Sequence, residues 1–150
     1  MPQMVDKSPF EVGKNLANTP GKVVYRNDLM ELIQYEAKTD QVHQTPVLIT
    51  PPWINKFYIL DLNEKKSFVR NLVNNGFTVF MISWKNPTTE LRNTSLDDYM
   101  LMGPVKGMTV VQEITGAENI HAVGYCIGGS LLATTMGWLK GPPVSYTHLT

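Results

Sequence analysis

The sequence predicts an α/β fold in which helices flank a parallel β-sheet. Two observations support this prediction. From residue 47 onward, short apolar runs alternate with helix-like segments in the order strand, helix, strand, helix, strand, helix. The runs are also apolar at nearly every position, as expected for parallel strands that are buried on both faces and joined by helical crossovers.

The predicted strands are short and bounded by loops. Residues 23–36 hold two extended pieces, KVVYRN and LMELIQYE, which predict a β-hairpin, and the polar residues 41–45 predict a loop after it. Pro51 and Pro52 end the first buried strand. The three strands predicted to be buried cover residues 47–50, 77–83 and 119–124.

Each predicted helix has recognisable end signals. Asn63 is the expected N-cap of the first helix, and Gly76 is a suitable stop. Ser95 and Asp98 resemble a capping box at the start of the second helix, and Gly103-Pro104 predicts a kink or break within it. The third helix is apolar almost all round, which indicates a buried helix. The helices cover residues 63–75, 95–115 and 127–140.

Composition excludes several classes of function. The chain has 150 residues, a hydrophobic fraction of 43% and a formal net charge of zero, so it lacks the basic footprint of a nucleic-acid-binding protein. Its single cysteine rules out an internal disulfide and suits a reducing compartment. Residues 121–139 carry no formal charge and have the length of a membrane span, but their glycines and polar residues predict a strand, a turn and a helix instead.

That cysteine, Cys126, stands in the sequence Gly124-Tyr125-Cys126-Ile127-Gly128, between a predicted strand and a predicted helix. A nucleophile elbow needs small residues two positions before and after the nucleophile, because the turn is sharp and larger side chains would clash. The positive end of the helix dipole would favour a thiolate there. A lone G-x-C-x-G is also compatible with a buried structural cysteine, but the strand-turn-helix context favours Cys126 as a catalytic nucleophile.

An elbow enzyme also needs an oxyanion hole made from two backbone N–H groups. One belongs to the residue after the nucleophile, here Ile127, and the other comes from the loop after the strand at 47–50. Pro51 and Pro52 have no N–H, so the donor must come later, and Ile54 is the predicted one. The alternative is a rigid surface loop in which Trp53 only fills core space.

Several segments of the chain resemble the polyhydroxyalkanoate synthases, within them the class I, poly-3-hydroxybutyrate type. The resemblance runs from about residue 6 to residue 140. It is strongest in PPWINKFYILDL, which together with the cysteine elbow is highly specific for this family. The segments that carry it are RNDLMELIQYE (26–36), PPWINKFYILDL (51–62), SWKNP (83–87), LDDY (96–99) and GYCIGG (124–129).

The resemblance implies an α/β-hydrolase fold in which cysteine replaces a lipase serine. It implies that Cys126 attacks a (R)-3-hydroxyacyl-coenzyme A thioester, releases coenzyme A and holds the acyl group, and that a hydroxyl of one acyl unit extends the polyester. No metal or cofactor is expected, because the coenzyme A thioester is the substrate. A homodimer in the cytoplasm, at the polyhydroxyalkanoate granule surface, is expected of the full-length protein.

The family's triad is Cys-Asp-His, with the acid and the histidine downstream of the cysteine. This chain has no Asp or Glu after Cys126, and its only later histidine is His148. We therefore expect a fragment that ends after the nucleophile helix and is inactive on its own. The expected divisions are a partly disordered N-terminal segment (1–22), the N-terminal part of a catalytic domain (23–143) and a tail of foreign sequence (144–150).

Two other functions fit the elbow alone. One is a cysteine-elbow hydrolase that cleaves esters or opens lactones, and the other is a non-catalytic remnant. PPWINKFYILDL favours the synthase over both.

Overall fold

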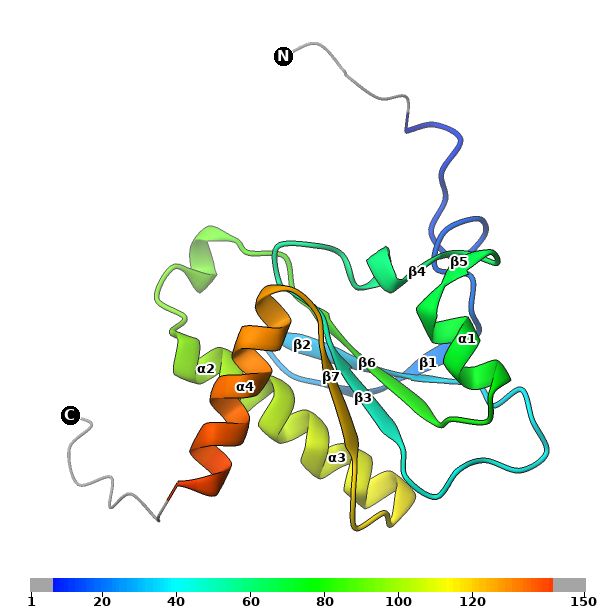
Figure 1. Cartoon of the computed structure of the whole chain (residues 1–150). Helices are drawn as coiled ribbons and strands as arrows, with labels where there is room; N and C mark the ends of the chain where they lie inside the picture. Colours follow the sequence, from blue (N-terminus) through cyan, green and yellow to red (C-terminus); the bar gives the residue numbers. More distant parts are fainter. Residues whose placement is uncertain (1–6, 142–150) are drawn as a thin grey trace.

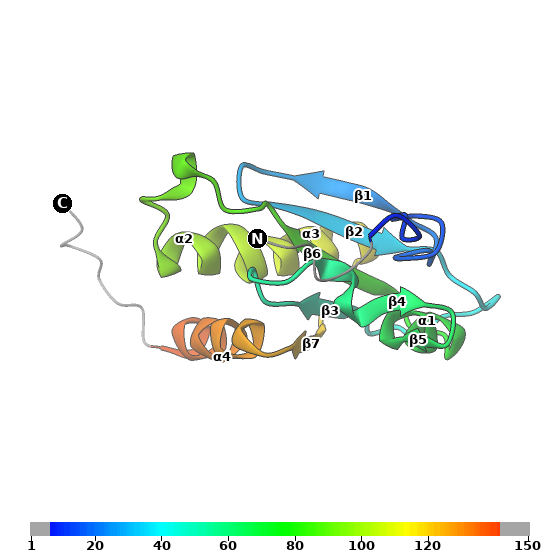
Figure 2. The ribbon, with the colours of Figure 1, turned by 90° about the horizontal axis from the view of Figure 1, so that it is seen from above.

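A five-stranded sheet organises the chain in a computed structural model that describes residues 7–141 (Figures 1 and 2). The strands follow the order β1-β2-β6-β3-β7 across the sheet. Their bounds are β1 (Gly21–Arg26), β2 (Met30–Tyr35), β3 (Val47–Thr50), β6 (Val79–Trp84) and β7 (His121–Gly124). A separate two-stranded ribbon pairs β4 (Asp61–Asn63) with β5 (Lys66–Ser67).

The sheet is parallel where the sequence predicts it to be. Strands β6, β3 and β7 run parallel, whereas β2 runs antiparallel to both β1 and β6. The predicted hairpin and the predicted alternation of strands and helices are thus confirmed. Because parallel strands end at the same edge, the segments after Thr50, Trp84 and Gly124 all leave the sheet on one side.

Helices cover both faces of the sheet, as Figure 1 shows. Their bounds are α1 (Phe68–Asn74), α2 (Leu96–Met100), α3 (Lys106–Thr115) and α4 (Ile127–Lys140), with 3-10 turns at Phe57–Leu60 and Thr89–Leu91. On one face, Val69 and Val73 of α1 pack in a cluster with Ile49 and Met81. On the other face, α2, α3 and α4 share a core with Leu48, Phe80 and Ile82.

The start of α1 differs from the prediction, because Ser67 rather than Asn63 is its N-cap. The Ser67 hydroxyl accepts a hydrogen bond from the backbone N–H of Arg70 at 2.9 Å. Asn63 instead accepts from the backbone N–H groups of Lys65 and Lys66 and closes the turn of the β4-β5 ribbon. An asparagine side chain serves a turn as well as a helix end, and the sequence does not distinguish the two uses.

The second predicted helix is divided in three. The capping box is confirmed, since the Ser95 hydroxyl accepts from the Asp98 N–H and the Asp98 carboxylate accepts from the Ser95 N–H. The predicted break at Gly103-Pro104 is also confirmed, in the form of a π-helical turn over Leu101–Val105 between α2 and α3. Proline removes one backbone donor, and the wider turn accommodates that loss.

The third strand and its helix are less buried than predicted. Strand β7 is an edge strand, and no residue of it is fully buried. Helix α4 buries Leu131 and Leu132, but Trp138 is 37% exposed and Leu139 is 49% exposed. The prediction of full burial is wrong because, within residues 7–141, β7 pairs with a strand on one side only and α4 packs against the protein with one face only. No helix among these residues combines the length and apolar character that crossing a bilayer requires.

A buried carboxylate joins the N-terminal segment to the ribbon. Asp61 is fully buried and accepts hydrogen bonds from the Thr19 hydroxyl and the Ser67 hydroxyl, both at 2.6 Å. The backbone N–H of Thr19 also donates to this carboxylate, and the backbone N–H of Ala17 donates to the Asp61 carbonyl oxygen. Residues 17–19 are therefore anchored to the same unit as β4, β5 and α1. The predicted tail at 144–150 lies outside the described residues.

Candidate active site

The site begins at the turn between β7 and α4, where Cys126 is exposed. Its backbone has φ 55° and ψ −129°, a conformation that L-residues rarely adopt. Such strain costs about 1–3 kcal/mol and persists only where the surrounding structure enforces it. The turn thus holds the Cys126 side chain at the carboxyl edge of the sheet, at the N-terminus of α4.

The two glycines that flank this turn are required by backbone contacts. A Cβ on Gly124 would lie 2.5 Å from the Cα of Gly129. A Cβ on Gly128 would lie 2.3 Å from the carbonyl oxygen of Thr50 and 2.7 Å from the carbonyl carbon of Pro51. Backbone atoms cannot rotate away as a flexible side chain can, so any larger residue would push these segments apart.

The same contacts place the loop after β3 beside the elbow. The backbone N–H of Tyr125 donates to the carbonyl oxygen of Thr50 at 3.2 Å. We call residues 51–54 the oxyanion loop, after the oxyanion-hole donor that the sequence predicts there. Its predicted donor residue, Ile54, has a side chain that is 68% exposed. Ile127, the other predicted donor, is the first residue of α4, and the N–H of a first helical residue has no partner within the helix.

The oxyanion loop packs against an aromatic cluster that the sequence did not predict. The indole N–H of Trp84 donates to the carbonyl oxygen of Pro51 at 2.7 Å in a buried hydrogen bond. The Trp53 ring packs on Tyr99, with ring centroids 4.7 Å apart, and Tyr99 packs on Trp84 at 5.2 Å. Trp53 is therefore a half-buried residue of the loop that packs against the core cluster containing Trp84 and Tyr99.

Neither described histidine lies near Cys126. His121 is the first residue of β7, so it stands at the opposite edge of the sheet from the elbow. His43 stacks on Phe77 with ring centroids 4.5 Å apart, and its Nε2 lies 3.1 Å from the Asn75 carbonyl oxygen, before β6 begins. Both histidines thus lie at the amino ends of the parallel strands, whereas a base for Cys126 must lie at their carboxyl ends.

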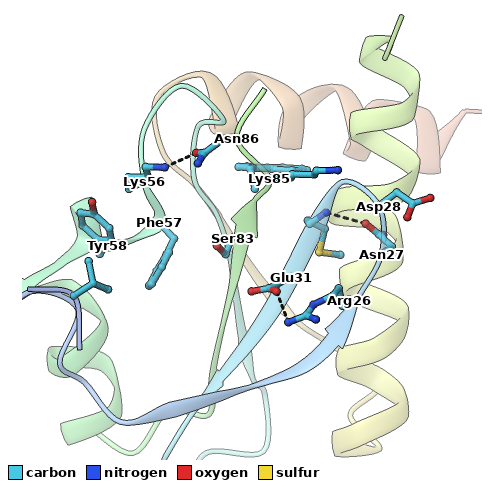
Figure 3. Close-up of a pocket in the computed structure, with 13 residues that line it drawn as sticks. Arg26, Asn27, Asp28, Glu31, Lys56, Phe57, Tyr58, Ser83, Lys85 and Asn86 are labelled. Carbon is cyan, nitrogen blue, oxygen red and sulfur yellow. Dashed lines mark hydrogen bonds and ion pairs between the residues drawn. The ribbon is translucent and has the colours of Figure 1, made fainter. Parts of the chain in front are cut away.

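A hollow of about 700 Å³ lies at the same carboxyl edge but over the β1-β2 turn (Figure 3). Its cations already have partners, because Arg26 pairs with Glu31 at 2.6 Å and Lys56 donates to Asn86. Cys126 does not line it. The lining residues are Val12, Arg26, Asn27, Asp28, Met30, Glu31, Lys56, Phe57, Tyr58, Ser83, Trp84, Lys85 and Asn86.

The strand order, the turn after β7 and the loop after β3 together define an α/β-hydrolase type of protein with a cysteine at the elbow position. Among known families, the model described as the poly-beta-hydroxybutyrate polymerase (PhaC) N-terminus matches residues 1–72. Beyond this segment, most of the chain is similar to curated proteins named poly(3-hydroxyalkanoate) polymerase, at 42% and 48% identity in the two relatives described next.

Two relatives illustrate the extent of this match. The poly(3-hydroxyalkanoate) polymerase of Methylorubrum extorquens is 48% identical over 91% of this chain and 22% of the relative. The PhaC subunit of the Cupriavidus necator polymerase is 42% identical over 97% of this chain and 25% of the relative. The chain therefore spans about a quarter of the length of the curated relatives it matches. Among solved structures, a lipase candidate from Sulfolobus solfataricus has 19% identity and a TM-score of 0.48, over 73% of this chain and 43% of that chain.

Proposed function

We propose that this chain is the nucleophile-bearing part of a poly(3-hydroxyalkanoate) polymerase, and that Cys126 carries the growing acyl chain. The observation that supports this most is the strained, exposed Cys126 on a turn in which Gly128 is in backbone contact with Pro51 of the oxyanion loop. A structural cysteine would have no need of exposure or of a strained backbone. The relatives are named for the polymer poly(3-hydroxyalkanoate), and the substrate in this proposal is a (R)-3-hydroxyacyl-coenzyme A.

In the first step, the Cys126 thiolate attacks the carbonyl carbon of the substrate thioester. The negative charge that develops on the carbonyl oxygen is stabilised by the backbone N–H groups of Ile127 and Ile54. The bond between that carbon and the coenzyme A sulfur then breaks, and the departing thiolate takes up the proton that Cys126 gave up. The acyl group is left as a thioester on Cys126.

In the second step, the hydroxyl oxygen of one acyl unit attacks the carbonyl of another acyl thioester. The hydroxyl proton passes to the thiolate that leaves, and an ester bond replaces the thioester bond. The acylation of Cys126 in the first step exchanges one thioester for another. That exchange is nearly balanced in energy, which suits cysteine rather than serine at this position. A base that relays these protons is worth about 10²–10⁴-fold in rate.

The described residues bring no histidine to Cys126, so we propose that residues 1–150 alone make no polymer. We also propose, from the family, that the working protein is a homodimer at the surface of the polyester granule and is of the class I type. Polymer made by the purified 150-residue chain would contradict the first of these proposals.

The experiment compares the protein expressed from its full reading frame with its Cys126→Ala and Cys126→Ser variants. Hydroxybutyryl-coenzyme A is supplied, and released coenzyme A and precipitated polyester are both measured. The proposal predicts both products from the parent protein and neither from Cys126→Ala. Free hydroxybutyrate without polymer would instead indicate a cysteine-elbow hydrolase, and no coenzyme A release would indicate a non-catalytic protein.

A further inference from the structure

Pro51 is the point at which several distant segments meet. Its carbonyl oxygen accepts the Trp84 indole N–H from β6, and its backbone is also in contact with Gly128 of the elbow. A Cβ on Gly128 would lie 2.8 Å from that same oxygen. The Pro51 carbonyl is thus clamped between the indole of Trp84 and the first turn of α4.

This clamp bears directly on where the oxyanion loop can point. Pro51 and Pro52 lack backbone N–H groups, so no donor of theirs can anchor the start of the loop. The carbonyl oxygen of Pro51 is therefore a hydrogen-bond acceptor through which this end of the loop can be anchored. Fixing its direction fixes the plane of the Pro51–Pro52 peptide group, and the ring of Pro52 restricts the next φ, so together they restrict the path toward Trp53.

The Trp84 ring is itself held on three sides. Tyr99 of α2 packs against it, and Trp53 meets it edge-on with ring centroids 6.4 Å apart and planes at 89°. The π-helical turn completes the enclosure, because a Cβ on Gly103 would lie 2.2 Å from Cη2 of the indole. Asn27, which directly follows β1, secures that turn by donating from its side-chain amide to the Met102 carbonyl at 2.9 Å.

We propose that Trp84 is a positioning residue for thioester attack, and that its N–H aims the oxyanion loop at the carbonyl oxygen that becomes negative. This inference rests on the proposed function. Trp84 touches neither sulfur nor substrate in this scheme and acts only through Pro51. Gly103 and Asn27 act one step further out, by keeping the indole in place.

The test uses the protein expressed from its full reading frame with Trp84→Phe. Two rates are measured: acylation of Cys126 by hydroxybutyryl-coenzyme A in a single turnover, and alkylation of Cys126 by iodoacetamide. Alkylation is a displacement at a saturated carbon and creates no oxyanion, so it reports the state of the sulfur alone. We expect acylation to slow by about 10- to 100-fold, as for a small misplacement of a catalytic group, with alkylation unchanged.

Two further variants keep the test decisive. A tryptophan analogue at position 84 in which sulfur replaces the indole N–H keeps the ring and its packing, and should reproduce the acylation defect even if Trp84→Phe fails to fold. Thr19→Val removes a buried hydrogen bond to Asp61 that involves none of these aromatic residues, and should leave both rates unchanged. Acylation at the parent rate in the analogue, or an equal loss of acylation and alkylation, would overturn the inference.

The failure of this inference can be told apart from the failure of the proposed function. If Cys126→Ala still makes polymer, the proposed function is wrong whatever Trp84 does. If Cys126 is required but the Trp84 variants acylate normally, the nucleophile assignment stands and only the role of Trp84 is refuted.

Discussion

Gly128 lies in backbone contact with Thr50, so closely that a Cβ on Gly128 would stand 2.3 Å from the Thr50 carbonyl oxygen. The first turn of α4 and the end of β3 are therefore packed main chain against main chain. The elbow and the oxyanion loop, which are at least 70 residues apart in sequence, are therefore close-packed at this point. Each side of that contact yields a measurable consequence.

Gly128→Ala should separate the elbow from the oxyanion loop, because the added methyl group meets backbone rather than a movable side chain. We expect the rate of coenzyme A release by the full protein to fall by about 10²-fold or more. The matched control is Gly137→Ala in the same helix, where a Cβ meets nothing within 4 Å. That control should keep full activity and gain up to about 1 kcal/mol of stability from better helix propensity. Equal activity in both variants would refute the steric argument.

Cys126→Gly should be more stable than Cys126→Ala. Both remove the thiol, but only glycine relaxes the strained backbone at φ 55°. The expected difference in the free energy of unfolding is about 1 kcal/mol, after allowance for the extra freedom of glycine in the unfolded chain. Denaturant midpoints of the two variants measure it. A less stable Cys126→Gly would mean that the turn is not strained in solution.

Tyr35 should make the protein sensitive to alkali. Burial raises the pKa of its hydroxyl, and the negative charge of Asp61 raises it further. The folded state therefore keeps the hydroxyl neutral at a pH where the unfolded chain ionises, so stability is present below about pH 10 and falls as the pH rises above it. Tyr35→Phe should reduce the drop in urea midpoint between about pH 8 and about pH 11. An unchanged drop would show that other groups cause it.

Ser67→Ala should destabilise the protein more than Asn63→Ala. Ser67 caps α1 and also donates to the buried carboxylate of Asp61, whereas Asn63 closes only an exposed turn. Loss of an N-cap typically costs about 0.5–2 kcal/mol, and the weakened support of a buried charge adds to it. Thermal unfolding of the two variants gives the comparison. The reverse ranking would restore Asn63 as the helix cap.

Local patterns were sufficient to predict most of the elements. The alternation of apolar runs and helix signals predicted β3, β6, β7 and their helices. For β3 and β6, burial on both faces leaves a direct mark on composition. The capping box at Ser95 and the break at Gly103-Pro104 are also local in origin. Their signals lie within a few residues of the structure that they determine.

Features that depend on distant partners were not predictable in this way. Nothing near Trp84 in the sequence indicates that its N–H reaches Pro51, 33 residues away, because this contact depends on how β6 lies beside β3. The exposure of β7 and of the outer side of α4 depends on which elements pack beside them, and composition indicates only that they are apolar. The cap at Ser67 was missed because Asn63 offers an equally good local signal.

The hydrogen bonds between Thr19 and Asp61 set a limit on how far the protein can be shortened. A shortened chain that starts after Thr19 would keep every strand of the sheet, yet would strip both Thr19 donors from a fully buried carboxylate and leave it the Ser67 hydroxyl. Each hydrogen-bond donor that a buried charged group loses costs about 1–3 kcal/mol, which is a large part of the stability of a typical domain. A minimal version intended for crystallisation should therefore start before residue 17.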